Sequence, residues 1–451
     1  MVFLKILYII NKNKNINQMK KFLTELLAGI STFSTMSYII FVQPAVLSSL
    51  GMDFNSVIFA TCISTAIATL LMALSTNLPF ALAPAMGHNF FFAFVICGTM
   101  GFSWREALAI NLFSGLVFVF LSIFGIVSVV TNSFPQSLKS SIAVGIGLMI
   151  AFVGLQWGGI VIPPADTNTI TKIGDIKSAP FVATMCGLLV SVFLYALGIR
   201  FSLIFGIATS TFVLWFRGYI SFFEGIISHP PSPLPTLLKY DFASLLSKDI
   251  TQILTIFFVL LILDIFDSIG TFIGLFEVGK IKADKKTIDK AFLSDAIGTV
   301  IGTALGTSTV TTYVESSAGI QAGGKTKITS IVVSILFVAA LFFTPLTRVI
   351  GGGIDFQGRQ IYPTIACALI LIGLFMTTSV KNINWDDLTE GAPAILTILF
   401  MAFSLSITEG IALGIISHTL LKLLTGRIKE TNIFMIVLSL LFAAKYLLLT
   451  Q

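Results

Sequence analysis

Long apolar stretches alternate with short polar connections along almost the whole chain. Each has the length of a membrane-crossing helix, because a crossing needs about 20 mainly apolar residues. The pattern predicts about fourteen such segments, at roughly residues 22–50, 55–75, 80–97, 105–130, 139–160, 180–198, 200–228, 250–276, 291–305, 311–323, 327–349, 361–380, 391–424 and 431–449. We therefore expect an all-α polytopic membrane protein, with one transmembrane unit over residues 22–451 and an N-terminal tail over residues 1–21.

The composition supports the same class of protein. Of the 451 residues, 56% are hydrophobic and only 11% are charged, and the mean hydropathy is +0.98. A soluble domain carries about 25% charged residues, so this composition excludes an ordinary soluble protein. The four cysteines lie in apolar stretches without CxxC spacing, which predicts packing residues.

Clusters of lysine predict the orientation of the chain. One cluster lies between two predicted segments and comprises Lys280, Lys282, Lys285, Lys286 and Lys290, and the tail carries Lys12, Lys14, Lys20 and Lys21. Cytoplasmic loops of membrane proteins are enriched in lysine and arginine, and the eight predicted segments between the clusters place both on one side. We expect a multi-pass plasma-membrane protein with a cytoplasmic N-terminus. The net charge of +6 is not arranged as a basic stripe with aromatics, so we expect no nucleic-acid partner.

Two segments in comparable places of the two halves would make poor uninterrupted helices. Residues 77–94, NLPFALAPAMGHNFFFAF, contain two prolines and a glycine, and residues 306–324, GTSTVTTYVESSAGIQAGG, are rich in Thr, Ser and Gly. In lipid, broken segments persist only where protein or a water-lined cavity satisfies their backbone. Paired broken segments are typical of the substrate site of an inverted-repeat transporter, although kinked helices or re-entrant loops that only aid packing would leave the same pattern.

Three carboxylates lie in or beside these apolar segments. Asp264 and Asp267, at positions i and i+3 of one segment, can project to the same side of a helix. A carboxylate at bilayer depth is costly and is a functional candidate by default. We expect Asp264 to bind substrate and Asp267 to act as a structural or coupling group. Glu315 follows the Thr/Ser run that contains Thr312, a further candidate ligand. Asp264 and Glu315 form the carboxylate pair we expect at the site, and one of the two is expected to take up and release a proton near neutral pH.

The first broken segment supplies uncharged candidates. Asn89 offers two donors and an acceptor without a charge. Phe90 and the two phenylalanines after it pack in the core or face lipid, or one of them stacks on a planar ring. His88 contacts ligand or proton, or simply bonds to backbone. Near predicted helix starts, Glu25 and Asp295 are expected to cap helices or interact with their dipoles.

No enzyme signature is present. The chain has no GxSxG, HExxH or P-loop motif, and neither His229 nor His418 has a metal-ligand pattern. We expect a transporter rather than an enzyme, with no cofactor and no metal, driven by an ion or substrate gradient. A channel would need a continuous polar pore, whereas the polar groups here cluster in three segments.

Four stretches of sequence carry a resemblance to a known family. They are residues 77–93, DIFDSIGTFIG at 264–274, LSDAIGTVIGTALGTSTVTTYVESSAGIQAGGKT at 293–326, and SITEGIALGIISHTLLKLLTGR at 406–427. The chain resembles, from about residue 20 onward, the AzgA-like hypoxanthine/guanine permeases of the nucleobase–cation symporter (xanthine/uracil permease) family. GTSTVTTYVESSAG is the most specific element of the match.

The resemblance implies a fold and a mechanism. The fold would be two inverted repeats of seven segments, with short strands in the broken third and tenth segments. A core domain over roughly 22–130 and 250–349 would move against a gate domain over roughly 131–249 and 350–451, through which the protein could dimerise. The function would be proton-coupled uptake of hypoxanthine, guanine or adenine, with the base held by Asn89, Asp264 and Glu315 and with Asp267 structural.

The sequence departs from the family at two positions. The family pattern resembles APGMGLN, whereas this chain has Ala85 at the second small position and His88 before Asn89, which leaves the identity of the purine open. The alternative transport function is an anion carrier of the related sulfate-permease type, but Asp264 and Glu315 disfavour it. The absence of arginine from the site segments also disfavours phosphorylated or carboxylated substrates.

Overall fold

The computed structural model describes residues 2–127, 134–163, 171–199, 201–221, 225, 227–404 and 407–449, with residues 2–18, 445 and 447–449 described by their backbone only. The first half contains the helices α1 (Val2–Met36), α2 (Ile39–Ser48), α3 (Phe54–Thr76), α4 (Met86–Phe90), the π-helix Phe91–Thr99, α5 (Trp104–Ile123), α7 (Gln136–Trp157), α8 (Ala179–Ala196), α9 (Ser202–Phe216) and α10 (Phe242–Leu245). The second half contains α11 (Ile250–Gly279), α12 (Lys285–Leu305), α13 (Ser316–Gln321), α14 (Lys327–Ala340), α15 (Thr344–Gly351), α16 (Pro363–Thr377), α17 (Leu388–Ser404), α18 (Ile407–Leu424) and α19 (Ile433–Leu449).

The remaining elements are short. Three two-stranded antiparallel sheets are formed by β1 (Leu82–Pro84) with β4 (Val310–Thr312), β2 (Val161–Ile162) with β3 (Lys172–Ile173), and β5 (Ile354–Phe356) with β6 (Arg359–Ile361). Short 3₁₀ helices lie at Leu341–Phe343, Thr378–Asn382 and Ile428–Glu430. In the described part of the chain, 9 helical stretches are long and apolar enough to cross a membrane, judged by length and composition. The predicted all-α polytopic class is confirmed.

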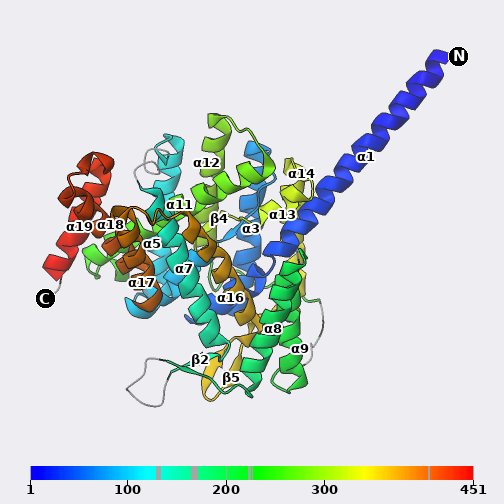
Figure 1. Ribbon diagram of the computed structural model, residues 1–451. Coiled ribbons are helices and arrows are strands. Elements are labelled where there is room, and N and C mark those ends of the chain that lie inside the picture. The colour runs from blue at the N-terminus through cyan, green and yellow to red at the C-terminus, as the bar shows by residue number, and fades with distance from the viewer. Residues whose placement is uncertain are drawn as a thin grey trace.

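Two predicted segments differ in detail from the structure. The stretch predicted as one span over 391–424 is two helices, α17 and α18, whereas α19, which packs on α18, corresponds to the segment predicted over 431–449. Helix α17 ends at Ser404 and α18 begins at Ile407, and both are mainly apolar, so a hydrophobicity pattern joins them into one segment. At the other end, α1 runs without interruption from Val2 to Met36 and projects from the body (Figure 1), so the expected tail joins the first predicted segment as one helix.

The two broken segments meet at the centre of the fold. Strand β1 pairs with β4 in the register Leu82↔Thr312, Ala83↔Thr311 and Pro84↔Val310. Each strand follows a helix that ends in a left-handed residue, Asn77 after α3 (φ 60°) and Gly306 after α12 (φ 96°). Each is followed by a short helix, α4 or α13. The strands predicted in the third and tenth segments are confirmed, and β4 lies among α3, α11 and α12 (Figure 1).

The helices fall into two groups. Around the paired strands, α1, α3, α5, α11, α12, α13 and α14 pack on one another, and α7, α8, α9, α16, α17 and α18 form the second group. Within the second group α7 and α16 approach closely, since a side chain at Gly147 would lie 2.7 Å from the carbonyl oxygen of Gly373. These groups correspond to the expected core and gate domains, whose exact boundaries stay a prediction.

Candidate functional site

Backbone pairing extends beyond the two strands and fixes the start of both short helices. The amide of Ala85 donates to the carbonyl of Thr309 at 2.9 Å, and the amide of Tyr313 donates to the carbonyl of Ala81 at 2.9 Å. The hydroxyl of Ser316 accepts from the Ala81 amide at 3.0 Å. Because these bonds satisfy main-chain groups that interrupted helices leave free, the segment before Asn89 and the segment before Glu315 form one rigid unit.

Asn89 is fully buried and presents amide donors next to this unit. Its Oδ1 accepts a hydrogen bond from the hydroxyl of Ser308, in the opposite broken segment. The Nδ2 group has the sulfur of Met86 at 4.0 Å as its partner. Sulfur is a weak acceptor, so the Asn89 amide has its oxygen engaged and its N–H groups available to a better acceptor.

Asp264 is buried, and only one of its two carboxylate oxygens accepts a hydrogen bond from the described residues. Its Oδ2 accepts from the hydroxyl of Thr299 at 3.1 Å, and that hydroxyl also lies 3.0 Å from the carbonyl oxygen of Val310 in β4. The other oxygen, Oδ1, is buried without a hydrogen-bond partner among the described residues. Leaving a buried acceptor unpaired is costly, so Oδ1 is suited to an N–H donor on a ligand.

Glu315 lies at the residue that precedes α13, within reach of the first segment. Its Oε1 accepts a hydrogen bond of 2.9 Å from the hydroxyl of Tyr38, at the break between α1 and α2. The hydroxyl of Thr35 is 3.4 Å from the Glu315 carbonyl. Glu315 is thus half-buried and oriented by α1, and its second carboxylate oxygen is not engaged by these bonds.

Asp267 differs from Asp264 despite the shared helix. Asp264 is buried, whereas the side chain of Asp267, one turn further along α11, is exposed. The two aspartates therefore occupy different environments, and their different roles stay a prediction.

Asp295 is not a helix cap, contrary to the prediction. It lies in the middle of α12, is fully buried, and accepts hydrogen bonds from Ser268, from Thr311 at 3.1 Å and from Thr312 at 2.8 Å. It therefore ties α11 and β4 to α12. The hydroxyl of Thr312, which was expected to bind substrate, donates a hydrogen bond to the carboxylate of Asp295.

Glu25 lies in α1 and caps the start of another helix, α14. The carboxylate accepts from the backbone amides of Lys325 at 3.1 Å and Thr326 at 3.3 Å, and from the hydroxyl of Thr329 at 2.5 Å. These groups lie at the start of α14, where amides have no partner within the helix. Glu25 of α1 therefore joins α14 to the first segment, and the expected capping role is confirmed.

His88 and Phe90, both in α4, are buried in different surroundings. His88 is 2% exposed, and neither ring nitrogen has a partner among the described residues, so the expected alternative of a backbone hydrogen bond is wrong. Phe90 is fully buried and stacks on Phe94, with ring centroids 5.5 Å apart, and lies 6.5 Å from the ring of Trp157 in α7. Phe90 thus sits where the first group of helices meets the second.

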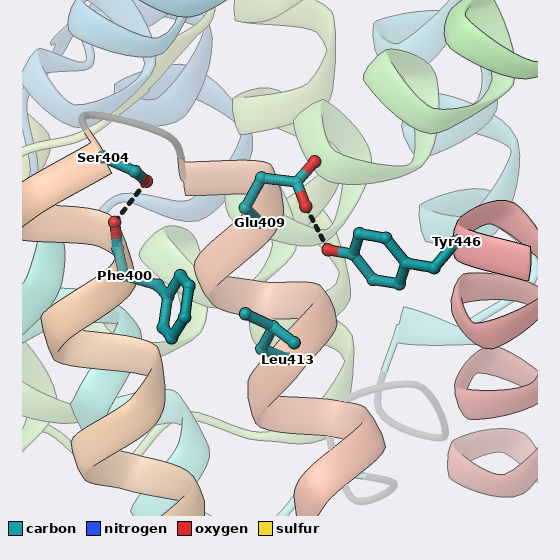
Figure 2. A pocket seen from close by; sticks show the side chains of 5 residues that line it. All are labelled: Phe400, Ser404, Glu409, Leu413 and Tyr446. Carbon is teal, nitrogen blue, oxygen red and sulfur yellow. Dashed lines mark hydrogen bonds between the residues drawn. The ribbon is translucent and has the colours of Figure 1, made fainter. Parts of the chain in front are cut away.

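A cavity of about 300 Å³ lies away from these residues. It is lined by Phe400, Ser404, Glu409, Leu413 and Tyr446, between α17, α18 and α19, where the Tyr446 hydroxyl donates to the Glu409 carboxylate (Figure 2). None of the predicted site residues lines it. The candidate site is therefore defined by its buried polar atoms and not by this cavity.

Several residues of the site carry no distinctive sequence signal. Tyr38, Thr299 and Ser308 orient Glu315, Asp264 and Asn89 respectively, and all three lie in apolar or Thr-rich stretches. Tyr313, whose hydroxyl donates to the carbonyl of Pro84, could have been found from its place beside Glu315 in the YVES motif.

Comparisons with known proteins agree with this architecture. The profile of the Permease family matches residues 23–413. Adenine permease AdeP of Escherichia coli strain K12 is 36% identical over 426 residues, which cover 94% of this chain and 92% of AdeP. Guanine/hypoxanthine permease PbuO of Bacillus subtilis strain 168 is 35% identical over 422 residues, covering 93% and 95%. Among solved structures, the transmembrane domain of the cyanobacterial bicarbonate transporter BicA matches with a TM-score of 0.60 at 13% identity, over 87% of this chain and 97% of that domain, a likeness of fold alone.

Proposed function

Since this chain belongs to the Permease family, we propose that it is a secondary active transporter that takes up a purine nucleobase by proton symport with alternating access. One observation carries the proposal: beside the pair β1–β4, Oδ1 of Asp264 and both ring nitrogens of His88 are buried and have no hydrogen-bond partner among the described residues. The adenine and guanine/hypoxanthine permeases among its relatives narrow the substrate to purines.

The free polar atoms match the edge of a purine. A purine base is flat and uncharged, with N–H donors and ring-nitrogen acceptors along its edge. Oδ1 of Asp264 accepts an N–H of the base, the amide of Asn89 donates to a ring nitrogen or carbonyl, and Glu315 accepts at the far side. Phe90 supplies an aromatic face at the boundary of the two helix groups.

The acids also supply a route for the coupled proton. A carboxylate within the bilayer is costly, and protonation removes its charge. A proton taken up by Glu315 or Asp267 therefore lowers the cost of moving the loaded site. Asp264, with Oδ1 free, stays available to the base.

Alternating access follows from the two groups of helices. We assign residues 22–130 and 250–349 to the core that carries the base and residues 131–249 and 350–451 to the gate, through which two copies would associate. The contact between Phe90 and Trp157 lies on the surface that would slide. We place the protein in the plasma membrane with its N-terminus in the cytoplasm, since the lysine clusters would then be inside.

An anion carrier is the alternative, and the acids oppose it. A buried site that holds Asp264 and Glu315 repels a negatively charged substrate. The similarity to a bicarbonate transporter, at 13% identity, is one of fold alone.

Uptake by proteoliposomes separates the two functions. Vesicles containing the full chain would be given radiolabelled adenine, hypoxanthine, guanine, sulfate or bicarbonate, with the outside made acidic. We expect uptake of at least one purine that is accelerated by the acidic exterior and collapses when a protonophore is added, with no uptake of the anions. Purine uptake at a rate independent of the proton gradient would overturn the proposed proton coupling. Anion uptake without purine uptake would overturn the proposed purine transport.

A further inference from the structure

A second cavity, of about 470 Å³, lies far along α12 from the paired strands, at the ends of two packed helices. It lies between the end of α5 and the start of α12. Its lining includes Ile123, Lys285, Lys286, Asp289, Lys290 and Leu293. Three lysines against one acid make this cavity strongly basic.

None of these lysines forms an ion pair within 4.0 Å among the described residues. Among the described residues, the ion pairs within 4.0 Å are made by His418, Lys422 and Arg427, at the other end of the sequence. Lys285, Lys286 and Lys290 are all exposed. Three unpaired ammonium groups around one cavity are suited to an anion.

An apolar stripe continues from the cavity along α5. Exposed large apolar side chains recur there with helical spacing and share one face, at Phe113, Leu116, Phe120, Ile123 and Phe124. Since α5 is one of the predicted membrane-crossing helices, this face meets acyl chains. The lysines therefore lie where an apolar surface gives way to water, which is the depth of a phospholipid headgroup.

We propose that this basic cavity is a binding site for an anionic phospholipid, whose headgroup is held by Lys285, Lys286 and Lys290 and whose acyl chains lie along the exposed face of α5. The combination of lysines with a contiguous apolar face favours a lipid over a free phosphate, because a free phosphate has no acyl chains to contact the apolar stripe on α5. Asp289 opposes the headgroup and weakens the site.

The site lies on the helix that also carries Asp295 and Thr299. Lys290 and Asp295 are five residues apart on α12, about 7.5 Å along the helix axis. The same helix carries Thr299, which holds Asp264. A lipid on the first turns of α12 thus contacts the helix that organises the proposed substrate site, although its binding does not depend on what that site carries.

Native mass spectrometry of the purified full chain in detergent tests the proposal. Phosphatidylglycerol and phosphatidylcholine with identical acyl chains would be titrated, with glycerol 1-phosphate as a competitor that carries the anion without the chains. Because each lysine near a membrane surface contributes a several-fold attraction, we expect phosphatidylglycerol to bind at least about tenfold more tightly than phosphatidylcholine. Glycerol 1-phosphate should not compete.

Matched variants locate the binding. The variant Lys285→Gln, Lys286→Gln, Lys290→Gln should bind both lipids equally, whereas Lys172→Gln, Lys177→Gln, Lys239→Gln, which also removes three exposed charges, should keep the preference. Asp289→Asn should tighten phosphatidylglycerol binding about threefold by removing the opposing charge. Equal binding of the two lipids to the wild type, an unchanged preference in the first variant, or full competition by glycerol 1-phosphate would overturn the proposal.

Discussion

The hydroxyl of Tyr38 donates a 2.9 Å hydrogen bond to the carboxylate of Glu315, joining residues that are 277 positions apart. Tyr38 lies at the break between α1 and α2, and Glu315 lies directly before α13. The bond connects the first segment of the first half with the broken segment of the second half. It sets the direction of the acid that we propose binds the base and takes part in proton coupling.

Removing this hydroxyl should weaken transport without unfolding the protein. In Tyr38→Phe the Glu315 carboxylate loses the donor that orients it, and hydrogen bonds to charged groups contribute about 1.5–3 kcal/mol. We expect the KM for purine uptake to rise about tenfold, the equivalent of about 1.4 kcal/mol. Tyr195→Phe, an exposed tyrosine of α8, is the control and should transport normally. Unchanged uptake by Tyr38→Phe would remove Tyr38 from the site.

Asp295 should be important for stability as well as for transport. Replacing it with Asn puts an N–H₂ group where one oxygen now accepts from hydroxyls of Ser268, Thr311 or Thr312. An unsatisfied buried group costs about 1–3 kcal/mol, so we expect a lower thermal midpoint in detergent and slower uptake. Asp386→Asn, which changes an exposed acid, should leave both unaltered. Equal midpoints for the two variants would contradict this role.

The approach of α13 to α1 depends on Gly319. A methyl group there would lie 2.1 Å from the Thr32 hydroxyl oxygen and 2.7 Å from the carbonyl oxygen of Ala28. To make room for the methyl group, the backbone of α1 would have to move. Gly319→Ala should therefore destabilise the protein by about 1–3 kcal/mol, measured as a lower thermal midpoint. Gly270→Ala in α11, with no heavy atom within 4 Å of the new methyl, is the matched control. A midpoint for Gly319→Ala at or above that of Gly270→Ala would show that the contact is loose.

The connection between α18 and α19 should give a pH-dependent contribution to stability. Hydrogen bonds from Arg427, and then Lys422, lower the pKa of Glu430 from 4.5 to about 2. A lowered pKa in the folded state stabilises the protein above the unfolded value, and the contribution disappears as the pH falls from 4.5 toward 2. Because Glu430 is 46% exposed, the effect is small.

Thermal melts of Glu430→Gln should reveal this window. We expect a midpoint roughly a few degrees below wild type at pH 7, with the gap narrowing once the pH falls below 4.5. Glu277→Gln, an exposed acid outside the ion pairs, controls for the loss of a charge. A gap that stays constant down to pH 3 would mean that the pairing with Arg427 contributes nothing.

Most of the fold could be predicted from hydrophobicity and from two interruptions of it. Prolines 79 and 84 and the Thr/Ser-rich run mark where helices cannot continue, and the resemblance to nucleobase permeases, now confirmed by the family match, added the strands. The hydrophobic pattern joined α17 and α18 into one segment, because both helices are mainly apolar. Hydrophobic patterns locate membrane depth, but they do not locate the ends of helices that remain in apolar surroundings.

The site could be predicted in its carboxylates and in Asn89, which follows the proline break, but not in the side chains that orient them. Asp264 and Glu315 stand out because a carboxylate in an apolar segment is rare. Their partners Thr299 and Tyr38 do not, since a hydroxyl among apolar residues is common and its partner lies far away in sequence. Asp295 was misassigned as a cap because its three donors come from other segments. The hydrogen bond from Thr312 to Asp295 could not be predicted for the same reason, and the contact of Thr312 with substrate stays a prediction.

The central claim is that the atoms around β1–β4 bind a purine, and equilibrium binding to the purified protein tests it most directly. Adenine, hypoxanthine and guanine would be titrated onto wild type, Asn89→Ala, Asp264→Asn and Glu315→Gln, with Glu277→Gln as the control and the thermal midpoint of each variant as the check on folding. We predict that wild type and control bind one of the bases, while the other three variants fold but bind it at least about tenfold more weakly. Wild-type affinity in all three variants would contradict the account.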